Sequence, residues 1–178
     1  MEYDLMIAGS GGQGILACGK IFAYAGMNEN LQVTYYPSYG AEVRGGTTRC
    51  GVRYSDVTIA SPIVDSADAL IVFNEPSLRK YISYLKHGGM LVCNSSLVHK
   101  LPHNGTYTVH QVPATDIAIE LGNEKVCNMV MSGFFLNLMP RISKQSLLKA
   151  MDEVFDDIKP ALKQLNQSAM EKGMEYAG

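Results

Sequence analysis

Short apolar runs and helical patterns alternate in the first part of the chain. Asp4–Ala8 is an apolar run that ends at a glycine, which is typical of a buried strand. Residues 15–26 then carry apolar side chains at helical spacing, and the β-rich run 31–36 ends at Pro37. A strand, a helix and a strand in this order predict a right-handed unit whose two strands pair in parallel.

The middle of the chain predicts an antiparallel insertion and further buried strands. Thr47–Tyr54 has the pattern of a strand with Arg49 and Arg53 on one face, and Val57–Ile59 is expected to be its short hairpin partner. The two arginines either extend a positive rim or form the exposed polar face of an antiparallel edge. Further elements are expected at 69–73, 90–93 and 107–112 as strands, and from Asn74 to about Lys86 as a helix with proline in its first turn.

The last third of the chain predicts helices. Patterns at 113–120 and 127–137 are helical, and an apolar stripe from Ile142 to Ile158 predicts an amphipathic helix packed on the sheet. Pro160 is expected to end that helix, and a shorter one over 161–172 closes the chain. The prediction is one α/β layered domain over residues 1–178, with a mostly parallel sheet, helices on both faces and an antiparallel insertion near residues 47–60.

Composition narrows the class of protein. With 178 residues, 47% hydrophobic and 18% charged, the chain suits one globular domain. A formal charge of −2 argues against nucleic-acid binding, which needs a basic face. No apolar run reaches the length of about 18 residues typical of a membrane span. The acidic residues Met1–Asp4 lead directly into a strand, unlike a signal peptide, so we expect a cytoplasmic protein without a membrane.

Residue types that carry catalysis or bind metals are scattered. The four cysteines lie more than 30 residues apart without a C-x-x-C pair, so we expect buried or half-buried free thiols and no metal site. The histidines lack metal-ligand spacing, and no serine stands in a G-x-S-x-G motif. We therefore assign no catalytic residue and do not expect a free-standing enzyme.

A glycine-rich turn between the first strand and the first helix is a candidate binding site. Gly9, Gly11, Gly12, Gln13 and Gly14 form the pattern G-x-G-G-Q-G. Glycines in this context allow a tight turn and close approach of an anion to the free N–H groups at the helix start. A dinucleotide site, a phosphate or loop contact, and a purely structural turn all remain open.

The acid that usually binds the ribose of a dinucleotide is missing. It should lie near the end of the second strand, about 20 residues after the glycines, where this chain has Val33–Pro37. The bulky polar Gln13 also stands where such turns often carry small or apolar residues.

A second glycine-rich segment follows the second strand, and we expect it to share one rim with the turn. An arginine there can grip a carboxylate or phosphate through two hydrogen bonds, and the nearby acid can hold the arginine or contact a partner. The alternative is a surface hairpin loop with a solvated ion pair. The candidate residues are Tyr39, Gly40, Glu42, Arg44, Gly45 and Gly46.

These motifs, in this order, resemble the gamma subunit of the 2-oxoacid:ferredoxin oxidoreductases. The resemblance rests on the Gly9–Gly14 and Pro37–Gly46 segments, on Val52-Arg53-x-Ser55 with Ile59-x-x-Pro62, and on Asn128-Met129-x-Met131-x-Gly133. It runs from about residue 5 to 170. Each piece alone is weakly specific, but the ordered set is specific.

The resemblance implies a Rossmann-like domain in a complex that oxidatively decarboxylates a 2-oxoacid, makes an acyl-CoA and reduces ferredoxin. It implies that this chain alone holds no cofactor, while alpha, beta and ferredoxin-like subunits supply thiamine diphosphate and iron–sulfur clusters. The gamma piece is expected to cover the active site and help receive coenzyme A at the two glycine-rich segments. A short chain without fused modules suits a 2-oxoglutarate or branched-chain enzyme.

Two other functions remain open from sequence. The glycine turn can serve a stand-alone NAD(P)-dependent oxidoreductase, although the missing ribose acid counts against it. A coenzyme-A-binding module that acts without partner subunits is the other.

Overall fold

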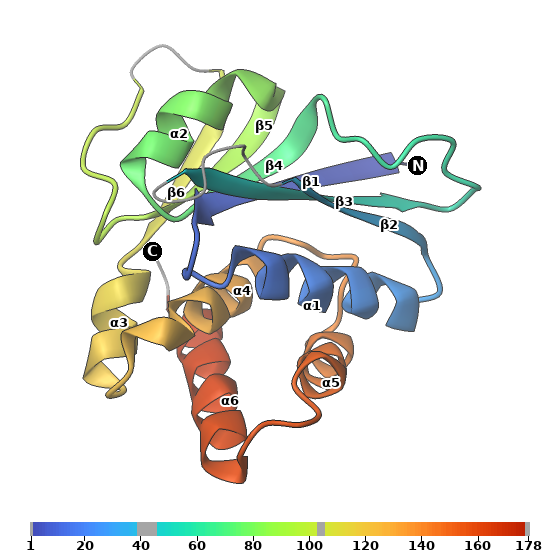
Figure 1. Cartoon of the computed structure of the whole chain (residues 1–178). Coiled ribbons are helices and arrows are strands. Elements are labelled where there is room, and N and C mark those ends of the chain that lie inside the picture. Colours follow the sequence, from blue (N-terminus) through green and yellow to red (C-terminus); the bar gives the residue numbers. More distant parts are fainter. Residues whose placement is uncertain (1, 39–45, 103–105, 177–178) are drawn as a thin grey trace.

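A six-stranded sheet forms the centre of the molecule in the computed structural model, which describes residues 2–38, 46–102 and 106–176. The strand order across the sheet is β2-β3-β1-β4-β5-β6 (Figure 1). The strands are β1 (Glu2–Ser10), β2 (Gln32–Ser38), β3 (Thr47–Ser55), β4 (Ala67–Val72), β5 (Leu85–Asn94) and β6 (Thr108–Val112).

The sheet is mostly parallel with one antiparallel strand. β1, β4, β5 and β6 pair in parallel, whereas β3 pairs antiparallel with both β1 and β2. The predicted direct pairing of the first two strands is therefore wrong, because β3 lies between them. A strand that returns after a short connection pairs antiparallel with the strand before it, and β3 does so beside β2.

The predicted hairpin partner at Val57–Ile59 is also wrong. Those residues form no strand. The reason is that β3 has no free edge, since residues 47–55 pair with β1 on one side and residues 49–55 pair with β2 on the other.

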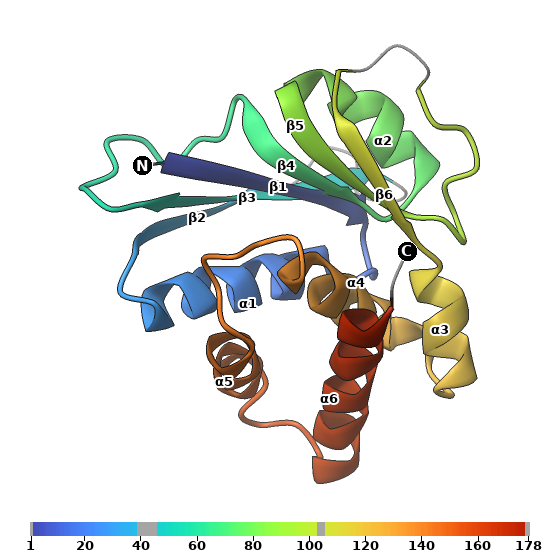
Figure 2. The same cartoon turned by 180° about the vertical axis from the view of Figure 1, so that it is seen from behind.

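Helices cover both faces of the sheet, as predicted. α1 and α4 lie on one face and α2 on the other (Figures 1 and 2). α5 packs on α1 and α6 on α4, so both lie in an outer layer; the prediction that the stripe of α5 packs on the sheet is wrong. The helices are α1 (Ile15–Asn28), α2 (Glu75–Tyr81), α3 (Ala114–Glu120), α4 (Cys127–Leu136), α5 (Lys144–Val154) and α6 (Pro160–Glu175), with 3₁₀ turns at Ile82–Tyr84 and Glu124–Val126.

Several helix ends differ from the prediction. α2 stops at Tyr81, and β5 already begins at Leu85, where the sequence pattern predicted helix up to about Lys86. Pro160 does not end α5, which stops at Val154; it lies in the first turn of α6, where a proline ring fits. α6 has 16 residues and is longer than α5, not shorter.

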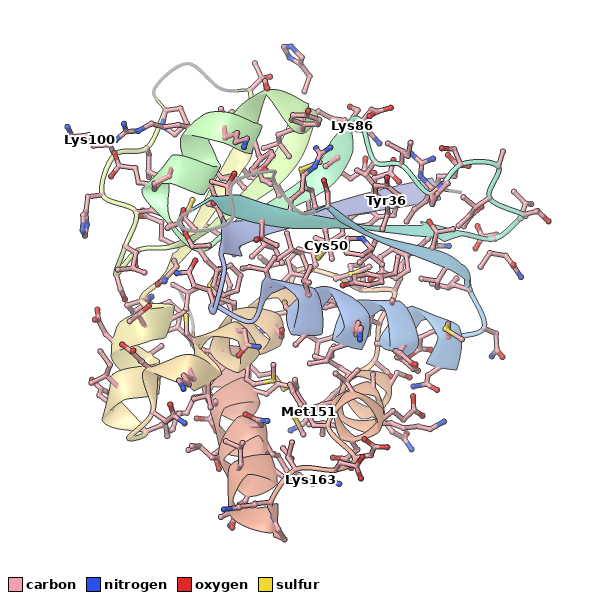
Figure 3. The ribbon with its side chains drawn as sticks, viewed as in Figure 1. Tyr36, Cys50, Lys86, Lys100, Met151 and Lys163 are labelled. Carbon is pink, nitrogen blue, oxygen red and sulfur yellow. The ribbon has the colours of Figure 1, made fainter. Side chains whose placement is uncertain are left out.

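The apolar core has two parts, one on each face of the sheet. The larger part packs β1, β3 and β4 against α1 and α4, and the smaller part packs the other face against α2. All four cysteines are buried free thiols, and Cys50 lies between the sheet and α1 (Figure 3). Within the described ranges, no helix has the length and apolar character needed to cross a bilayer.

Candidate functional site: the glycine turn

The glycine turn lies where several parallel strands end. β1 ends at Ser10, β4 is followed by Asn74, and β5 ends at Asn94. In open α/β sheets, ligands bind outside the carboxyl ends of the parallel strands. The fold therefore places the turn at the edge of the sheet where a ligand is expected.

A polar network holds the turn in shape. The side-chain oxygen Oε1 of Gln13 accepts hydrogen bonds from Ser10 N at 2.7 Å and from Asn74 Nδ2 at 2.8 Å. Asn74 Nδ2 also donates to Ser10 Oγ at 2.9 Å, and its Oδ1 caps α2 by accepting from Ser77 N at 2.9 Å. The bulky Gln13 thus replaces a small residue because its amide braces the loop from inside.

Gly14 begins α1 in a conformation that other residues rarely adopt. Its φ is 73°, and a Cβ atom there would meet the side chain of Asn128. Asn128 is buried and donates from Nδ2 to Gly14 O at 3.3 Å. This close contact fixes the start of α1 against α4.

Gly11 and Gly12 have a different surrounding. Both are exposed, and a Cβ atom at either would meet no atom of the described residues within 4 Å. Gly12 has a φ of 89°, but Gly11 does not lie in the left-handed region. The chain itself therefore does not require glycine at position 11, and the missing side chain leaves room for something outside the chain.

Backbone N–H groups at the start of α1 are available to an anion. The first hydrogen bond of the helix runs from Cys18 N to Gly14 O at 3.0 Å, so the N–H groups of residues 15–17 have no acceptor within the helix. Together with the helix dipole, such groups favour a phosphate.

The structure brings the ends of the second glycine-rich segment beside the turn. Thr47 pairs with Ser10 and Thr48 with Gly9, while Ser38 pairs with Arg49 at the same end of β3. Gly46 directly precedes β3. The shared rim is thus confirmed for the residues that flank this segment. The predicted site residues Tyr39, Gly40, Glu42, Arg44 and Gly45 lie outside the described residues.

Two hollows lie on either side of the turn, and both are lined by Gly11 and Gly12. We call the one toward α3 and α4 the α4-side hollow; it has a volume of about 310 Å³ and includes Thr115, Glu124 and Lys125. The α1-side hollow has about 460 Å³ and includes Leu16, Ala17 and Thr48.

A third hollow continues the series along α1. This outer groove, of about 480 Å³, lies between α1, β2 and the end of α5. It shares Leu16 and Ala17 with the α1-side hollow and also contains Lys20, Tyr35, Pro37 and Phe155. A track therefore runs from the α4-side hollow, across Gly11 and Gly12, to the outer groove.

The thiol in the α4-side hollow is not an activated nucleophile. Burial raises the pKa of Cys127 to about 11, although a hydrogen bond with Thr115 Oγ1 at 3.6 Å acts in the opposite direction. A thiol of this kind stays protonated near neutral pH, and only the thiolate attacks substrates.

Arg49 and Arg53 do not lie on an edge strand, and Arg53 lies away from the rim, opposite Asp4 near the start of β1. Arg53 pairs with Asp4, with 2.6 Å between Nε and Oδ1, and donates to Ser61 O at 3.0 Å. The guanidinium of Arg49 lies over the ring of Tyr84, 4.7 Å from its centre. Both arginines are used within the domain.

The alternative of a dinucleotide site loses support from the topology. In dinucleotide-binding domains the ribose acid stands at the end of the strand next to the first one. Here the antiparallel β3 occupies that place, and the end of β2 carries Tyr36, Pro37 and Ser38. In the part of the chain that the structure describes, no three His, Cys, Asp or Glu side chains are grouped to hold a metal ion.

Sequence reasoning missed the residues that come from other elements. Asn74 was recognised only as a helix start, and Asn128 only as part of a motif. Thr48, Thr115 and Lys125 line the hollows from β3, α3 and the 3₁₀ turn before α4. A helix cap directly after a buried strand was the one local signal available for Asn74.

Comparison with known sequences gives the family. Residues 4–176 match the family described as pyruvate ferredoxin/flavodoxin oxidoreductase. The ketoisovalerate oxidoreductase subunit VorA of Methanothermobacter thermautotrophicus is 34% identical over 99% of this chain, which spans 36% of that relative's length. The 2-oxoglutarate synthase subunit KorC of Methanocaldococcus jannaschii is 33% identical over 99% of this chain and 95% of its own.

Solved structures share the fold. The gamma subunit of a keto/oxoacid ferredoxin oxidoreductase from Geobacter sulfurreducens has a TM-score of 0.83 and 32% identity, over 97% of this chain and 96% of that one. The 2-oxoglutarate:ferredoxin oxidoreductase of Magnetococcus marinus, solved with 2-oxoglutarate, coenzyme A and succinyl-CoA, has a TM-score of 0.87 at 24% identity, over 97% of this chain and 30% of that one. The resemblance to gamma subunits found in the sequence is confirmed, and the chain belongs to the pyruvate ferredoxin/flavodoxin oxidoreductase family.

Proposed function

We propose that this chain is the gamma subunit of a 2-oxoacid:ferredoxin oxidoreductase complex and that it helps to receive coenzyme A. The complex decarboxylates a 2-oxoacid oxidatively, forms an acyl-CoA and reduces ferredoxin. The observation that carries the proposal is the open backbone at Gly11 and Gly12, which joins two hollows beside the N–H groups of α1 that have no acceptor within the helix.

The turn binds the diphosphate of coenzyme A in this proposal. Backbone N–H groups at the start of α1 donate to the phosphate oxygens, and the absence of a Cβ at Gly11 lets the ligand approach the backbone. Gln13 and Asn74 hold these donors in place before the ligand arrives, so little ordering is needed on binding. The site orients coenzyme A and performs no bond-making step itself.

Other subunits carry the redox chemistry. Alpha and beta subunits would hold thiamine diphosphate, and ferredoxin-like subunits would hold the iron–sulfur clusters. The described part of this chain offers no grouped metal ligands, and each of its thiols is buried as a free cysteine. The substrate we favour is 2-oxoglutarate or a branched-chain 2-oxoacid, because relatives with both names cover nearly all of this chain.

The segment Tyr39–Gly46 completes the site in this proposal. Its flanking residues Ser38 and Thr47 lie beside the turn, and Arg44 provides a guanidinium suited to a phosphate. Arg44 could instead hold the docking surface for another subunit.

Arg44→Ala in the assembled complex tests this proposal. A lost charge-assisted contact corresponds to about 1.5–3 kcal/mol. We therefore expect the apparent dissociation constant of coenzyme A to rise by roughly ten- to a hundredfold. The melting temperature of the subunit should stay unchanged. The control is Arg79→Ala, which removes an exposed guanidinium that pairs with Glu75 along α2. An unchanged coenzyme A constant with normal assembly would contradict the proposed role of the loop.

A further inference from the structure

The outer groove differs in character from the turn. Tyr35, Pro37 and Phe155 give it flat apolar walls, and Lys20 is its one charged lining residue among the described part of the chain. Lys20 is exposed and forms no ion pair with another described residue. A flat apolar slot with one free cation suits an aromatic ring that carries an anionic group nearby.

The groove is continuous with the turn. Leu16 and Ala17 line both the α1-side hollow and the outer groove. Leu16 and Lys20 are four residues apart on α1 and therefore lie on the same face of the helix. A ligand that is bound over the N-terminus of α1 can extend along this face, because the two hollows share these two described residues.

The position of Lys20 fits a phosphate near that ligand. From Gly14 to Lys20 the helix rises by about 9 Å, at 1.5 Å per residue. Helical side chains lean toward the N-terminus, so the ammonium group of Lys20 leans back toward the turn. The span between them is that of a diphosphate followed by one ribose.

We propose that the outer groove receives the 3′-phosphoadenosine end of coenzyme A, with Lys20 pairing with the 3′-phosphate. This inference rests on the proposed function. It sets the direction of the ligand: the adenine lies against Tyr35 and Phe155, the diphosphate lies over the turn, and the pantetheine arm leaves in the opposite direction, past Gly11 and Gly12. Lys20 is then a specificity residue, because it distinguishes coenzyme A from its analogue without the 3′-phosphate.

The reverse direction is chemically less suitable. In the α4-side hollow, Glu124 stands beside Lys125, and both side chains are exposed. A carboxylate next to the lysine opposes the binding of a phosphate with two negative charges. Gln13 and Thr115 in the lining of that hollow instead offer partners for the amide groups of a pantetheine arm.

Coenzyme A and dephospho-coenzyme A, measured on the assembled complex, test the inference. The wild-type complex should prefer coenzyme A, as judged by KM and by direct binding in a calorimeter. An exposed phosphate–lysine pair predicts a preference of about three- to tenfold. Lys20→Gln should remove this preference and leave the affinity for dephospho-coenzyme A unchanged, since that ligand has no group for Lys20.

Two further variants make the result decisive. Lys125→Gln should keep the preference for coenzyme A. Lys172→Gln should also keep it, because this variant removes one positive charge from α6 and not from the outer groove. Loss of the preference in Lys125→Gln would place the nucleotide in the α4-side hollow and overturn the inference. A wild-type complex without any preference, or a Lys20→Gln complex that keeps it, would also overturn the inference.

The proposed function can fail separately. If Gly11→Val leaves the binding of both ligands unchanged, the turn is not a coenzyme A site. If Gly11→Val weakens the binding of both ligands while Lys20→Gln leaves the preference for coenzyme A unchanged, the turn is still a coenzyme A site and only the proposed direction of the ligand is wrong.

Discussion

At the scale of single residues, the glycines of the turn serve different purposes. Gly14 is required by the fold, because its φ of 73° and its contact with Asn128 leave no room for a side chain. Gly11 is not required by the described part of the fold, because no described residue lies within 4 Å of where its Cβ would be. The same motif thus contains one glycine that the fold requires and one that, in our proposal, makes room for the ligand.

Gly14→Ala and Gly11→Ala form a matched pair that tests this division. Strain at a left-handed position costs about 1–3 kcal/mol, so Gly14→Ala should lower the melting temperature of the isolated chain by roughly 2–12 °C. Gly11→Ala should leave the melting temperature unchanged but weaken coenzyme A in the complex. Equal melting temperatures for the two variants, whether both unchanged or both lowered, would contradict this division of roles.

At the scale of elements, α4 and α6 pack closely against each other. A Cβ atom on Gly133 would meet the carbonyl oxygen of Met170, and one on Gly173 would meet the carbonyl oxygen of Val130. Each glycine therefore faces the backbone of the other helix. Backbone atoms cannot move aside as a flexible side chain can, so the two helices approach this closely only with glycine at both positions.

Gly133→Ala should therefore destabilise the chain. Overpacking costs about 1–3 kcal/mol or more, whereas the better helix propensity of alanine alone would stabilise by about 0.5–1 kcal/mol. The measurement is urea unfolding, with Gln167→Ala on the exposed side of α6 as the control, which should change stability by less than about 0.5 kcal/mol. A stabilised Gly133→Ala chain would show that the helices have room to spare.

The elements themselves were largely predictable, but their neighbours were not. The strands near residues 4–8 and 69–73 were found because short apolar runs are local signals, and the strand at 47–54 because its side chains alternate between two faces. The pairing of β3 with both β1 and β2 depends on which strand returns to which edge, and no local pattern encodes that choice. For the same reason α5 was expected on the sheet. Its apolar stripe indicates that the helix packs against another element, but it does not indicate that this element is α1.

The site shows the same limit. The turn and its flanking loop were found from their glycines, because a turn leaves its mark within a few residues. Asn74 and Asn128 were not found as parts of the site, because they reach it from elements 61 and 114 residues away. The order of the hollows along the track depends on several elements together and could be seen only in the structure.

At the scale of the whole molecule, the buried thiols and phenols make the free energy of unfolding depend on pH in the alkaline range. Burial raises the pKa of Cys18 to about 12 from an ordinary value of 9.0, and that of Cys93 also to about 12. Burial likewise raises the pKa of Tyr3 to about 12 from 10.0. These groups keep their protons in the folded chain at a pH where the unfolded chain loses them.

The free energy of unfolding should therefore change little through these groups below about pH 8 and fall as the pH rises toward 12. A difference of one unit between the folded and unfolded pKa corresponds to about 1.4 kcal/mol, and several groups add to the slope. Urea unfolding under reducing conditions at about pH 8 and about pH 10.5 measures this change. Equal stability at both values would show that the thiols are open to solvent.

The relatives of this chain are subunits of larger oxidoreductases. The curated VorA relative contains the equivalent of this chain as about a third of its length, and the KorC relative has it as a separate chain. We accordingly expect the isolated chain to be colourless and unable to turn over a 2-oxoacid. Surfaces that a partner covers in the complex would favour self-association of the chain alone.

The most direct test is reconstitution of the complex with and without this chain. The measurement is the reduction of ferredoxin in the presence of a 2-oxoacid, with 2-oxoglutarate first and a branched-chain 2-oxoacid second, and with coenzyme A. We predict that turnover requires this chain together with the thiamine- and cluster-bearing subunits, and that the chain alone gives none. Turnover by the chain alone, or full turnover by the other subunits without it, would contradict the account.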